Sequence, residues 1–291
     1  MSNAPFEFAY PNYVLAPSTL YNIGGPADMA LIPRNEQEAL DAYAWMLHQP
    51  GKKLILGGGS NVLIADEGYR GTVLFTNELK RWDDMGNGRY FFGSGLVLDD
   101  IVQNPMLEKN YAGVGGLTGI PGSVGGAIYM NAGTIKGTIC QLMESVEVLT
   151  PGGISVIPMS EDLYGYRGQT FCDPGGVILG GAFKFQVAEE DQTAIYRHYK
   201  QRRVEKQPQG RCCGSVFKNP EGGHAGRLIE ECGIKGTRHG GALISPMHAN
   251  FIMNEDNARF ADVIALIELA RNAVWEKFGI RLEEEVKIIG S

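Results

Sequence analysis

The chain has 291 residues, of which 44% are hydrophobic and 20% are charged, proportions typical of a soluble globular protein. Its formal net charge of −7 argues against a general affinity for nucleic acid or for an anionic membrane surface. The five cysteines are odd in number and lack CxxC spacing, which argues against a disulfide framework and a zinc site. We therefore expect two or three domains and a reducing compartment.

The N-terminal residues MSNAPFEFAYPNY do not show the basic region and apolar core of a secretory signal. No uncharged apolar run in the sequence approaches the ~20 residues that are needed to cross a bilayer. These two patterns predict a cytoplasmic protein.

Residues 1–80 form a predicted α+β unit. The apolar side chains of Asn35–Gln49 have helical spacing, and Asn35 is the expected N-cap. Strands are expected within Leu20–Pro33, around Leu54, over Val62–Ile64 and over Thr72–Thr76.

A glycine turn interrupts this first unit. Residues Lys53–Ile64 read KLILGGGSNVLI, which is an apolar strand, three glycines, Ser60 and Asn61, and a second apolar strand. This is neither the GxGxxG fingerprint that opens a helix nor a Walker loop. Such a break between strands can direct several N–H groups and a hydroxyl at one anion.

Residues 81–206 form the second predicted unit. The turn Pro151–Gly153 joins two strands as a hairpin, a short helix begins at Leu98, and Glu189–Lys206 form a helix with Ile195, Tyr199 and Val204 inward. Strands are expected over Tyr90–Phe92, Ala127–Met130, Val146–Leu149, Ile154–Ile157 and Val177–Val187.

The second unit contains the densest glycine run of the chain. Tyr111–Gly133 read YAGVGGLTGIPGSVGGAIYMNAG, without a single charge. Internal glycines weaken helices and strands, so we expect an ordered and partly buried loop. Its backbone N–H groups can form a cradle for phosphates, or the run can be a set of tight turns packed on a sheet. Two separate cradles suit an extended ligand with a pyrophosphate, such as a dinucleotide.

Residues 207–279 form a third unit, which follows the break at Gln207–Gly210. It contains an amphipathic helix over Ala258–Phe278, with Gly279 as the expected C-cap. The remaining residues, 280–291, contain a last strand, Glu284–Ile289, that is expected to return to the body of the protein.

GGGSN at Gly57–Asn61 and GIPGSVGGAIYMNAG at Gly119–Gly133 resemble the FAD-binding segments of the UDP-N-acetylenolpyruvoylglucosamine reductase family, and the resemblance runs from about Asn22 to Gly290. It implies an α+β fold, with 1–80 and 81–206 as two subdomains of a PCMH/vanillyl-alcohol-oxidase-like FAD-binding body and 207–279 as a substrate-binding domain. It also implies FAD and NADPH as cofactors. The implied FAD-binding residues lie in these two glycine segments and are Gly57, Gly58, Gly59, Ser60, Asn61, Val62, Gly119, Ile120, Pro121, Gly122, Ser123, Gly125, Gly126 and Ala127.

Three polar residues stand in distinctive settings far apart in the chain: Arg167 in YGYR, Ser215 in CGSVFKNP and Glu285 in LEEEVKIIG. Taken alone, they read as a surface ion-pair residue, a hydrogen-bonding turn residue and part of a solvated acidic run. The resemblance instead implies that all three surround the flavin. There, an arginine stabilises charge on the substrate carboxylate, a glutamate assists it, and a serine donates a proton.

The resemblance implies that the substrate is a UDP-sugar carrying an enolpyruvyl group, which is reduced in peptidoglycan synthesis. Its diphosphate requires cations, and the implied substrate-binding residues are Arg203, Lys206, Lys218 and Asn219.

The short separation of Arg167 from Ser215 resembles the subclass without an inserted tyrosine loop. One departure is Gln169, which replaces a serine of many members. We expect no metal and a monomer. The alternatives are an FAD-dependent oxidase of an alcohol or hydroxy acid, and a non-catalytic nucleotide-binding module.

Overall fold

The computed structural model describes residues 5–290 and divides into two compact units. Unit 1 contains the described residues up to Pro11, together with Asp28–Gly58 and Gly71–Arg202. Unit 2 contains Asn12–Ala27, Gly59–Arg70 and the described residues from Arg203 onward. The chain therefore passes between the units repeatedly. The division into 1–80, 81–206, 207–279 and 280–291 stays a prediction, although the last change of unit lies close to residue 206.

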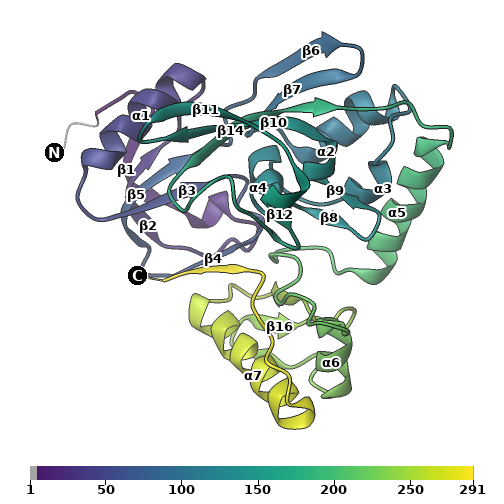
Figure 1. Ribbon diagram of the computed structural model, residues 1–291. Helices are drawn as coiled ribbons and strands as arrows, with labels where there is room; N and C mark the ends of the chain where they lie inside the picture. The colour runs from purple at the N-terminus through teal and green to yellow at the C-terminus, as the bar shows by residue number, and fades with distance from the viewer. Residues whose placement is uncertain (1–4, 291) are drawn as a thin grey trace. The chain divides into compact units, whose positions relative to one another are not determined.

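The centre of unit 1 is a five-stranded sheet in the order β11-β10-β14-β7-β6, in which neighbouring strands are antiparallel (Figure 1). The predicted hairpin after Thr150 is confirmed, because Thr150 of β10 pairs with Gly153 of β11. The strands of this sheet are β6 (Trp82–Gly86), β7 (Arg89–Gly93), β10 (Met143–Thr150), β11 (Gly153–Pro158) and β14 (Val177–Lys184).

Short helices cover one face of this sheet: α2 (Leu98–Ile101), α3 (Val114–Leu117) and α4 (Val124–Tyr129). Val124 and Ile128 of α4 are buried in one core with Phe92 of β7 and Phe183 of β14. The strand predicted over Ala127–Met130 is therefore wrong, as is the expectation that the glycine run contains no helix.

The reason for the helical turn of α4 lies in its start and in its packing. Ser123 is the N-cap, and its Oγ accepts the N–H of Gly126 at 3.4 Å. Gly125 lies so close to its neighbour that an added Cβ would be 2.5 Å from the Cβ of Ser94. Close packing requires glycine here, and it outweighs the low helix propensity of this residue.

A second sheet has the order β1-β2-β5-β3, and α1 (Glu36–His48) lies beside it in Figure 1. The predicted helix is confirmed with its cap, since Asn35 Oδ1 accepts the N–H of Glu38 at 2.9 Å. Buried Ala42 and Met46 of α1 share a core with Leu31 and Leu74. The strands are β1 (Ala9–Val14), β2 (Pro26–Leu31), β3 (Lys52–Leu56) and β5 (Tyr69–Phe75), with β3 and β5 parallel.

The helix predicted from Glu189 begins later, as α5 (Gln192–Lys206). Asp191 Oδ1 accepts the N–H groups of Thr193 and Ala194, which marks the start. Val204 was expected to point inward, but its side chain is 52% exposed. Two hairpins complete this part of the chain: β8 (Gly133–Thr134) with β9 (Gly137–Thr138), and β12 (Tyr164–Gly165) with β13 (Gly168–Gln169).

Unit 2 is built around α7 (Phe260–Phe278), which confirms the predicted amphipathic helix. Val263, Ile267 and Val274 are buried, and Gly279 ends the helix with a φ of 67°. Its other elements are α6 (Ala225–Glu231), the antiparallel strands β15 (Arg238–His239), β16 (Ala242–Ile244) and β17 (Ile252–Asn254), and the parallel pair β4 (Val62–Ile64) and β18 (Lys287–Ile289).

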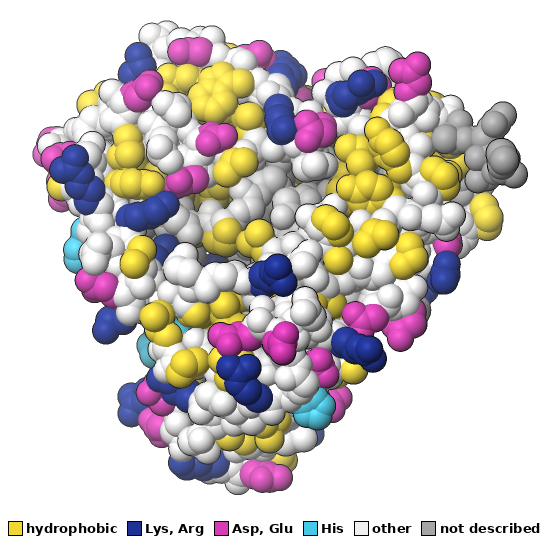
Figure 2. Space-filling view, turned by 180° about the vertical axis from the view of Figure 1, so that it is seen from behind, with side chains coloured by type: hydrophobic (Ala, Val, Ile, Leu, Met, Phe, Trp, Pro, Cys, Tyr) yellow, Lys and Arg dark blue, Asp and Glu magenta, His cyan; other side chains and the backbone are white. Residues whose placement is uncertain are grey.

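Within residues 5–290 there is no helix that is both long enough and apolar enough to cross a membrane. The same residues contain no group of three His, Cys, Asp or Glu side chains arranged to hold a metal ion. On the face shown in Figure 2, Lys and Arg side chains are interspersed with Asp and Glu side chains. This face therefore offers no broad basic area for a nucleic acid backbone.

Candidate active site

The first feature of the site is the meeting of two glycine segments within unit 1. The N–H of Gly58 donates to Ser123 Oγ at 3.2 Å, and the same oxygen accepts the N–H of Gly126. An added Cβ at Gly57 would lie 2.7 Å from Ser123 Oγ, and one at Gly58 would lie 3.0 Å from Ser123 N. The end of β3 and the start of α4 thus form one continuous backbone surface, centred on the Ser123 hydroxyl.

Parts of this surface are accessible. Gly58, Pro121 and Gly126 are exposed, whereas Gly125 and Ala127 are buried. The turn before α4 needs glycine at two positions, because Gly119 and Gly122 have φ values of 66° and 118°. Gly119, Ile120 and Gly122 are half-buried, so the connection between α3 and α4 presents backbone to the exterior.

The remaining residues of the GGGSN motif belong to unit 2. Gly59 has a φ of 60°, and an added Cβ would be 2.0 Å from the carbonyl oxygen of Ser18. Ser60 is half-buried in the turn, and Val62 begins β4. Asn61 Nδ2 donates to the carbonyl oxygen of Glu285 at 3.0 Å. This motif therefore fixes the backbone of a predicted catalytic residue.

Arg167 lies in unit 1, in the turn of the β12–β13 hairpin, with a φ of 57°. Non-glycine residues in this left-handed region cost about 1–3 kcal/mol and cluster at functional sites. Its Nη1 donates to the carbonyl oxygen of Gly133 at 3.3 Å. The hairpin is held by Asn131, whose Nδ2 donates to the carbonyl oxygen of Gly165 at 2.9 Å.

Gln169, which departs from the family pattern, has a clear structural task. Its Nε2 donates to the carbonyl oxygen of Cys172 at 2.8 Å, and its Oε1 accepts the N–H of Cys172 at 2.7 Å. Both ends of the amide are thus used to anchor the chain that follows the hairpin of Arg167.

Ser215 and Glu285 are brought together by unit 2. The N–H of Glu285 donates to the carbonyl oxygen of Val216, the residue after Ser215, at 2.8 Å. Phe217 and Glu284 form an antiparallel bridge beside this bond. The two predicted catalytic residues therefore lie on paired segments, while Arg167 belongs to unit 1.

The structure also separates Glu285 from its two acidic neighbours. Glu283 Oε1 is 2.5 Å from Lys218 Nζ, and Glu284 forms an ion pair with Arg271. Lys218 is therefore engaged by the carboxylate of Glu283.

A cavity of about 280 Å³ in unit 2 includes two predicted residues, Ser215 and Asn219. The other polar side chains around it include those of His224, Arg227 and His248. Burial lowers the pKa of His248, and the charge of Lys235 lowers it further. His248 is thus favoured as a neutral hydrogen-bonding group beside a polar cavity.

The predicted substrate-binding residues have different surroundings. Asn219 Oδ1 accepts the N–H of Ala225 at 3.1 Å, at the start of α6. Arg203 Nη1 donates to Gln207 Oε1 at 3.1 Å, just beyond α5. Lys206 is exposed at the last residue of α5. Their contact with a substrate stays a prediction.

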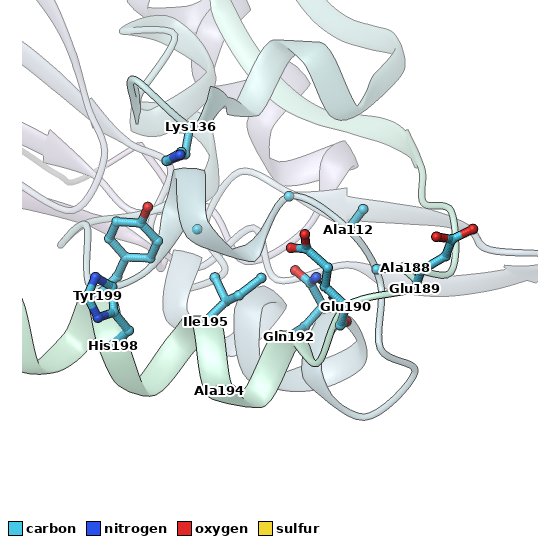
Figure 3. Close-up of a pocket in the computed structure, with 12 residues that line it drawn as sticks. Ala112, Lys136, Ala188, Glu189, Glu190, Gln192, Ala194, Ile195, His198 and Tyr199 are labelled. Carbon is cyan, nitrogen blue, oxygen red and sulfur yellow. Dashed lines mark hydrogen bonds between the residues drawn. The ribbon is translucent and has the colours of Figure 1, made fainter.

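A second cavity, of about 780 Å³, lies in unit 1 and contains none of the predicted site residues (Figure 3). In that view, Lys136 and Tyr199 lie at one end, Glu190 and Gln192 lie at the other, and Ile195 lies between them. Such a mixed-charge lining is unsuited to a diphosphate, so we assign it no part in binding the nucleotide.

All five cysteines, which lie in the described part of the chain, are free thiols. Burial raises the pKa of Cys213 to about 12 and also raises the pKa of Cys212. Neither thiol has the low pKa of a nucleophilic cysteine. This buried environment favours a role in packing over reactivity with thiol reagents.

Comparison with known proteins accounts for nearly the whole chain. The family described as "FAD binding domain" matches residues 27–157, and "UDP-N-acetylenolpyruvoylglucosamine reductase, C-terminal domain" matches residues 206–289. The UDP-N-acetylenolpyruvoylglucosamine reductase of Chloroflexus aggregans is 37% identical over 289 residues, which cover 96% of this chain and 97% of that protein. The enzyme of that name from Anaeromyxobacter dehalogenans is 40% identical over 284 residues, with 95% and 84% covered.

The crystal structure of UDP-N-acetylenolpyruvylglucosamine reductase from Thermus caldophilus matches with a TM-score of 0.81 at 34% identity, covering 95% of this chain and 97% of that one. The predicted α+β fold, with an FAD-binding region followed by a C-terminal domain, is confirmed. At this identity and coverage, the chain belongs to the UDP-N-acetylenolpyruvoylglucosamine reductase family.

Proposed function

We infer that the chain is an FAD-dependent oxidoreductase that uses NADPH to reduce the enolpyruvyl group of UDP-N-acetylglucosamine enolpyruvate to UDP-N-acetylmuramate, in peptidoglycan synthesis. The observation that carries this is similarity to reductases of this name along 96% of the chain, through both the FAD-binding and the C-terminal regions. An oxidase of an alcohol or hydroxy acid is not favoured, because the similarity includes the C-terminal domain of the reductase family.

The flavin is held by the two glycine segments. In unit 1, Gly57, Gly58 and Gly126 meet around Ser123, and Gly119–Gly122 form a half-buried to exposed turn, so that phosphate oxygens can approach the main chain. Gly59, Ser60 and Asn61 follow Gly58 directly in the sequence and complete the proposed set of FAD-binding residues. FAD bound there would supply two-electron redox chemistry that connects NADPH to the enolpyruvyl group of the substrate.

The protein's own residues manage the charge and the proton of that step. Hydride addition to the methylene carbon places an electron pair on the neighbouring carbon and its carboxylate. The guanidinium of Arg167 binds this carboxylate and stabilises the growing negative charge, and Glu285 contributes a hydrogen bond when protonated. The hydroxyl of Ser215 gives its proton to the carbanionic carbon and is reprotonated from solvent.

The UDP moiety is bound by Arg203, Lys206 and Asn219, with Lys218 released from Glu283 or shared with it. The small polar cavity that includes Ser215 and Asn219 supports a ligand beside the proton donor. The five free thiols are consistent with a cytoplasmic location. We propose a monomer.

The test is a separation of the two half-reactions of the FAD-loaded protein. The variant Ser215→Ala should keep the rate of flavin reduction by NADPH, because no proton is given to the substrate in that step. Anaerobic reoxidation by the enolpyruvyl sugar nucleotide should slow by about 10²–10⁴-fold, the usual contribution of a positioned proton donor. Equal slowing of both half-reactions would rule out the role of Ser215. Failure of the wild-type protein to be reoxidised by this substrate would rule out the proposed function.

A further inference from the structure

The segment that carries Ser215 is bonded three times to a single residue, Asn250. The N–H of Val216 donates to the carbonyl oxygen of Asn250 at 2.9 Å. The N–H of Phe217 donates to Asn250 Oδ1 at 2.9 Å, and Asn250 Nδ2 donates to the carbonyl oxygen of Phe217 at 2.8 Å. The side-chain amide thus acts as a short piece of strand, which requires one acceptor and one donor in a single group.

Asn250 is itself well fixed. It is only 3% exposed, so its polar atoms depend on these partners instead of water. Its own N–H donates to Nδ1 of His248 at 3.2 Å, and it lines the same cavity as Ser215. An asparagine at this position therefore connects the wall of the cavity to the backbone beside the proton donor.

The opposite side of the same segment holds the residues around Glu285. The N–H of Glu285 donates to the carbonyl oxygen of Val216, and the N–H of Lys218 donates to the carbonyl oxygen of Glu283 at 2.8 Å. Val216–Lys218 is thus held between Asn250 on one side and the Glu283–Glu285 segment on the other. Loss of the side-chain amide of Asn250 removes both bonds to Phe217, while the bond from the Val216 N–H to the backbone carbonyl oxygen of residue 250 and the bonds to the Glu283–Glu285 segment remain. The Ser215 segment would then be held less firmly on the Asn250 side than on the other.

We propose that Asn250 is a positioning residue that holds the Ser215 hydroxyl in line for proton transfer to the substrate. This inference rests on the proposed function. A serine hydroxyl is a weak acid, and its efficiency in general acid catalysis depends on its placement. A displacement of about 1 Å from the reacting atom can cost about 10²-fold in rate.

The chain offers a matched control in Asn254, which is 6% exposed in the same unit. Its side chain also makes one donor and one acceptor bond to backbone, from Nδ2 to the carbonyl oxygen of Tyr21 and from the N–H of Ala258 to Oδ1, both at 2.8 Å. These partners lie outside Val216–Lys218. A general loss of stability should therefore affect Asn254→Ala and Asn250→Ala alike.

The experiment measures both half-reactions of the FAD-loaded variants Asn250→Ala, Asn254→Ala and Ser215→Ala, and of the double variant of Ser215 and Asn250. We expect Asn250→Ala to slow anaerobic reoxidation by the enolpyruvyl sugar nucleotide about 10–10²-fold, with flavin reduction by NADPH unchanged. Asn254→Ala should change neither rate. Adding Asn250→Ala to Ser215→Ala should cause no further slowing, because the proton donor is already absent.

If Asn250→Ala does not fold, Asn250→Asp provides a second test. It keeps the acceptor for Phe217 N–H but donates to the Phe217 carbonyl only when the carboxyl is protonated. Its reoxidation rate, relative to the wild-type rate, should therefore rise as the pH falls through the pKa of that carboxyl. The proposal would be overturned if Asn250→Ala and Asn254→Ala slowed reoxidation equally. It would also be overturned if the slowing by Asn250→Ala multiplied in full with the slowing by Ser215→Ala, or if the reoxidation rate of Asn250→Asp relative to wild type did not change with pH. If the wild-type protein is not reoxidised by the substrate, the proposed function itself fails.

Discussion

Substitution of Gly57 by alanine tests whether the two glycine segments form one packed surface. Gly57 does not have a positive φ, so alanine adopts this backbone conformation without strain. The new methyl group, however, would lie 2.7 Å from Ser123 Oγ and 3.6 Å from Thr76 Oγ1. The first distance is too short for any real contact, so the Ser123 hydroxyl must move.

The cost follows from the two hydrogen bonds that this hydroxyl accepts. Gly58 and Gly126 donate to Ser123 Oγ at 3.2 Å and 3.4 Å, and each such bond contributes about 0.5–1.5 kcal/mol. Loss of both costs about 1–3 kcal/mol, which is offset by about 0.4–1 kcal/mol from the reduced entropy of the unfolded chain. The net cost lies between about 0 and 2.6 kcal/mol, and we expect Gly57→Ala to lower the free energy of unfolding by about 1–2 kcal/mol, the middle of this range.

The assay is urea unfolding of the flavin-free protein, analysed as a double-mutant cycle with Ser123→Ala. Ser123→Ala removes the same two bonds and also the oxygen that collides with the new methyl group. The double variant should therefore be no less stable than Ser123→Ala alone, with a coupling free energy that cancels most of the cost of Gly57→Ala. FAD affinity, measured by fluorescence quenching, should fall in all three variants.

Gly152→Ala is the control, because Gly152 has no positive φ and an added Cβ would make only an ordinary contact with Thr150 Oγ1, at 3.6 Å. It should leave stability within about 0.5 kcal/mol of the wild-type value. Strictly additive effects of Gly57→Ala and Ser123→Ala would refute the packing argument. So would a Gly57→Ala variant as stable as the control.

Two further predictions concern unit 2. Burial raises the pKa of the Cys213 thiol to about 12, above its ordinary 9.0, so its contribution to stability is complete below pH 9 and is lost as the pH rises toward 12. The free energy of unfolding should fall less steeply between pH 9 and 11 for Cys213→Ala than for the wild-type protein, and parallel slopes would contradict this. Asp66 Oδ2 accepts the N–H of Phe260 at 3.0 Å, where α7 begins. Asp66→Ala should cost about 0.5–2 kcal/mol in urea unfolding, whereas Asp66→Asn retains most of this bond, and equal stability of both variants would exclude the capping role.

The long helices could be predicted from sequence because their determinants are local. The side chain of Asn35 bonds to Glu38, three residues along the chain, and Gly279 ends α7 through its own backbone conformation. The apolar face of α7 can be recognised from its helical spacing without knowing which apolar surface it packs against. These features act within a few residues, so a sequence pattern is sufficient to locate them.

The short helix α4 could not be predicted in the same way. Its sequence, VGGAIY, combines two glycines with β-branched and aromatic residues, which locally favour a strand or a turn. The deciding contact is the close approach of Gly125 to Ser94, which comes from a distant part of the chain. Tertiary packing here outweighs local propensity, and only the folded chain shows it.

The role of Asn250 illustrates the same limit within the site. Asn250 lies in the segment HANF, which does not match the spacing of metal ligands or of a nucleophile and its base. The sequence around it therefore predicts no function for this residue. The motifs around Ser215 and Glu285 could be found because the residue types match a known family pattern. Asn250, on the other side of the Ser215 segment from Glu285, pairs with backbone, and backbone partners leave no trace in the identity of the neighbouring side chains.

The run of three glutamates shows how the fold assigns different tasks to similar side chains. Glu283 and Glu284 are ion-paired with Lys218 and Arg271, which fixes the first two residues of the run. The backbone of Glu285 is then held twice, by its own N–H on Val216 and by Asn61 on its carbonyl oxygen. Ion pairs with external partners thus reduce the repulsion that would otherwise raise the cost of a third carboxylate. The same arrangement ties the position of Glu285 to both the Ser215 segment and the GGGSN turn.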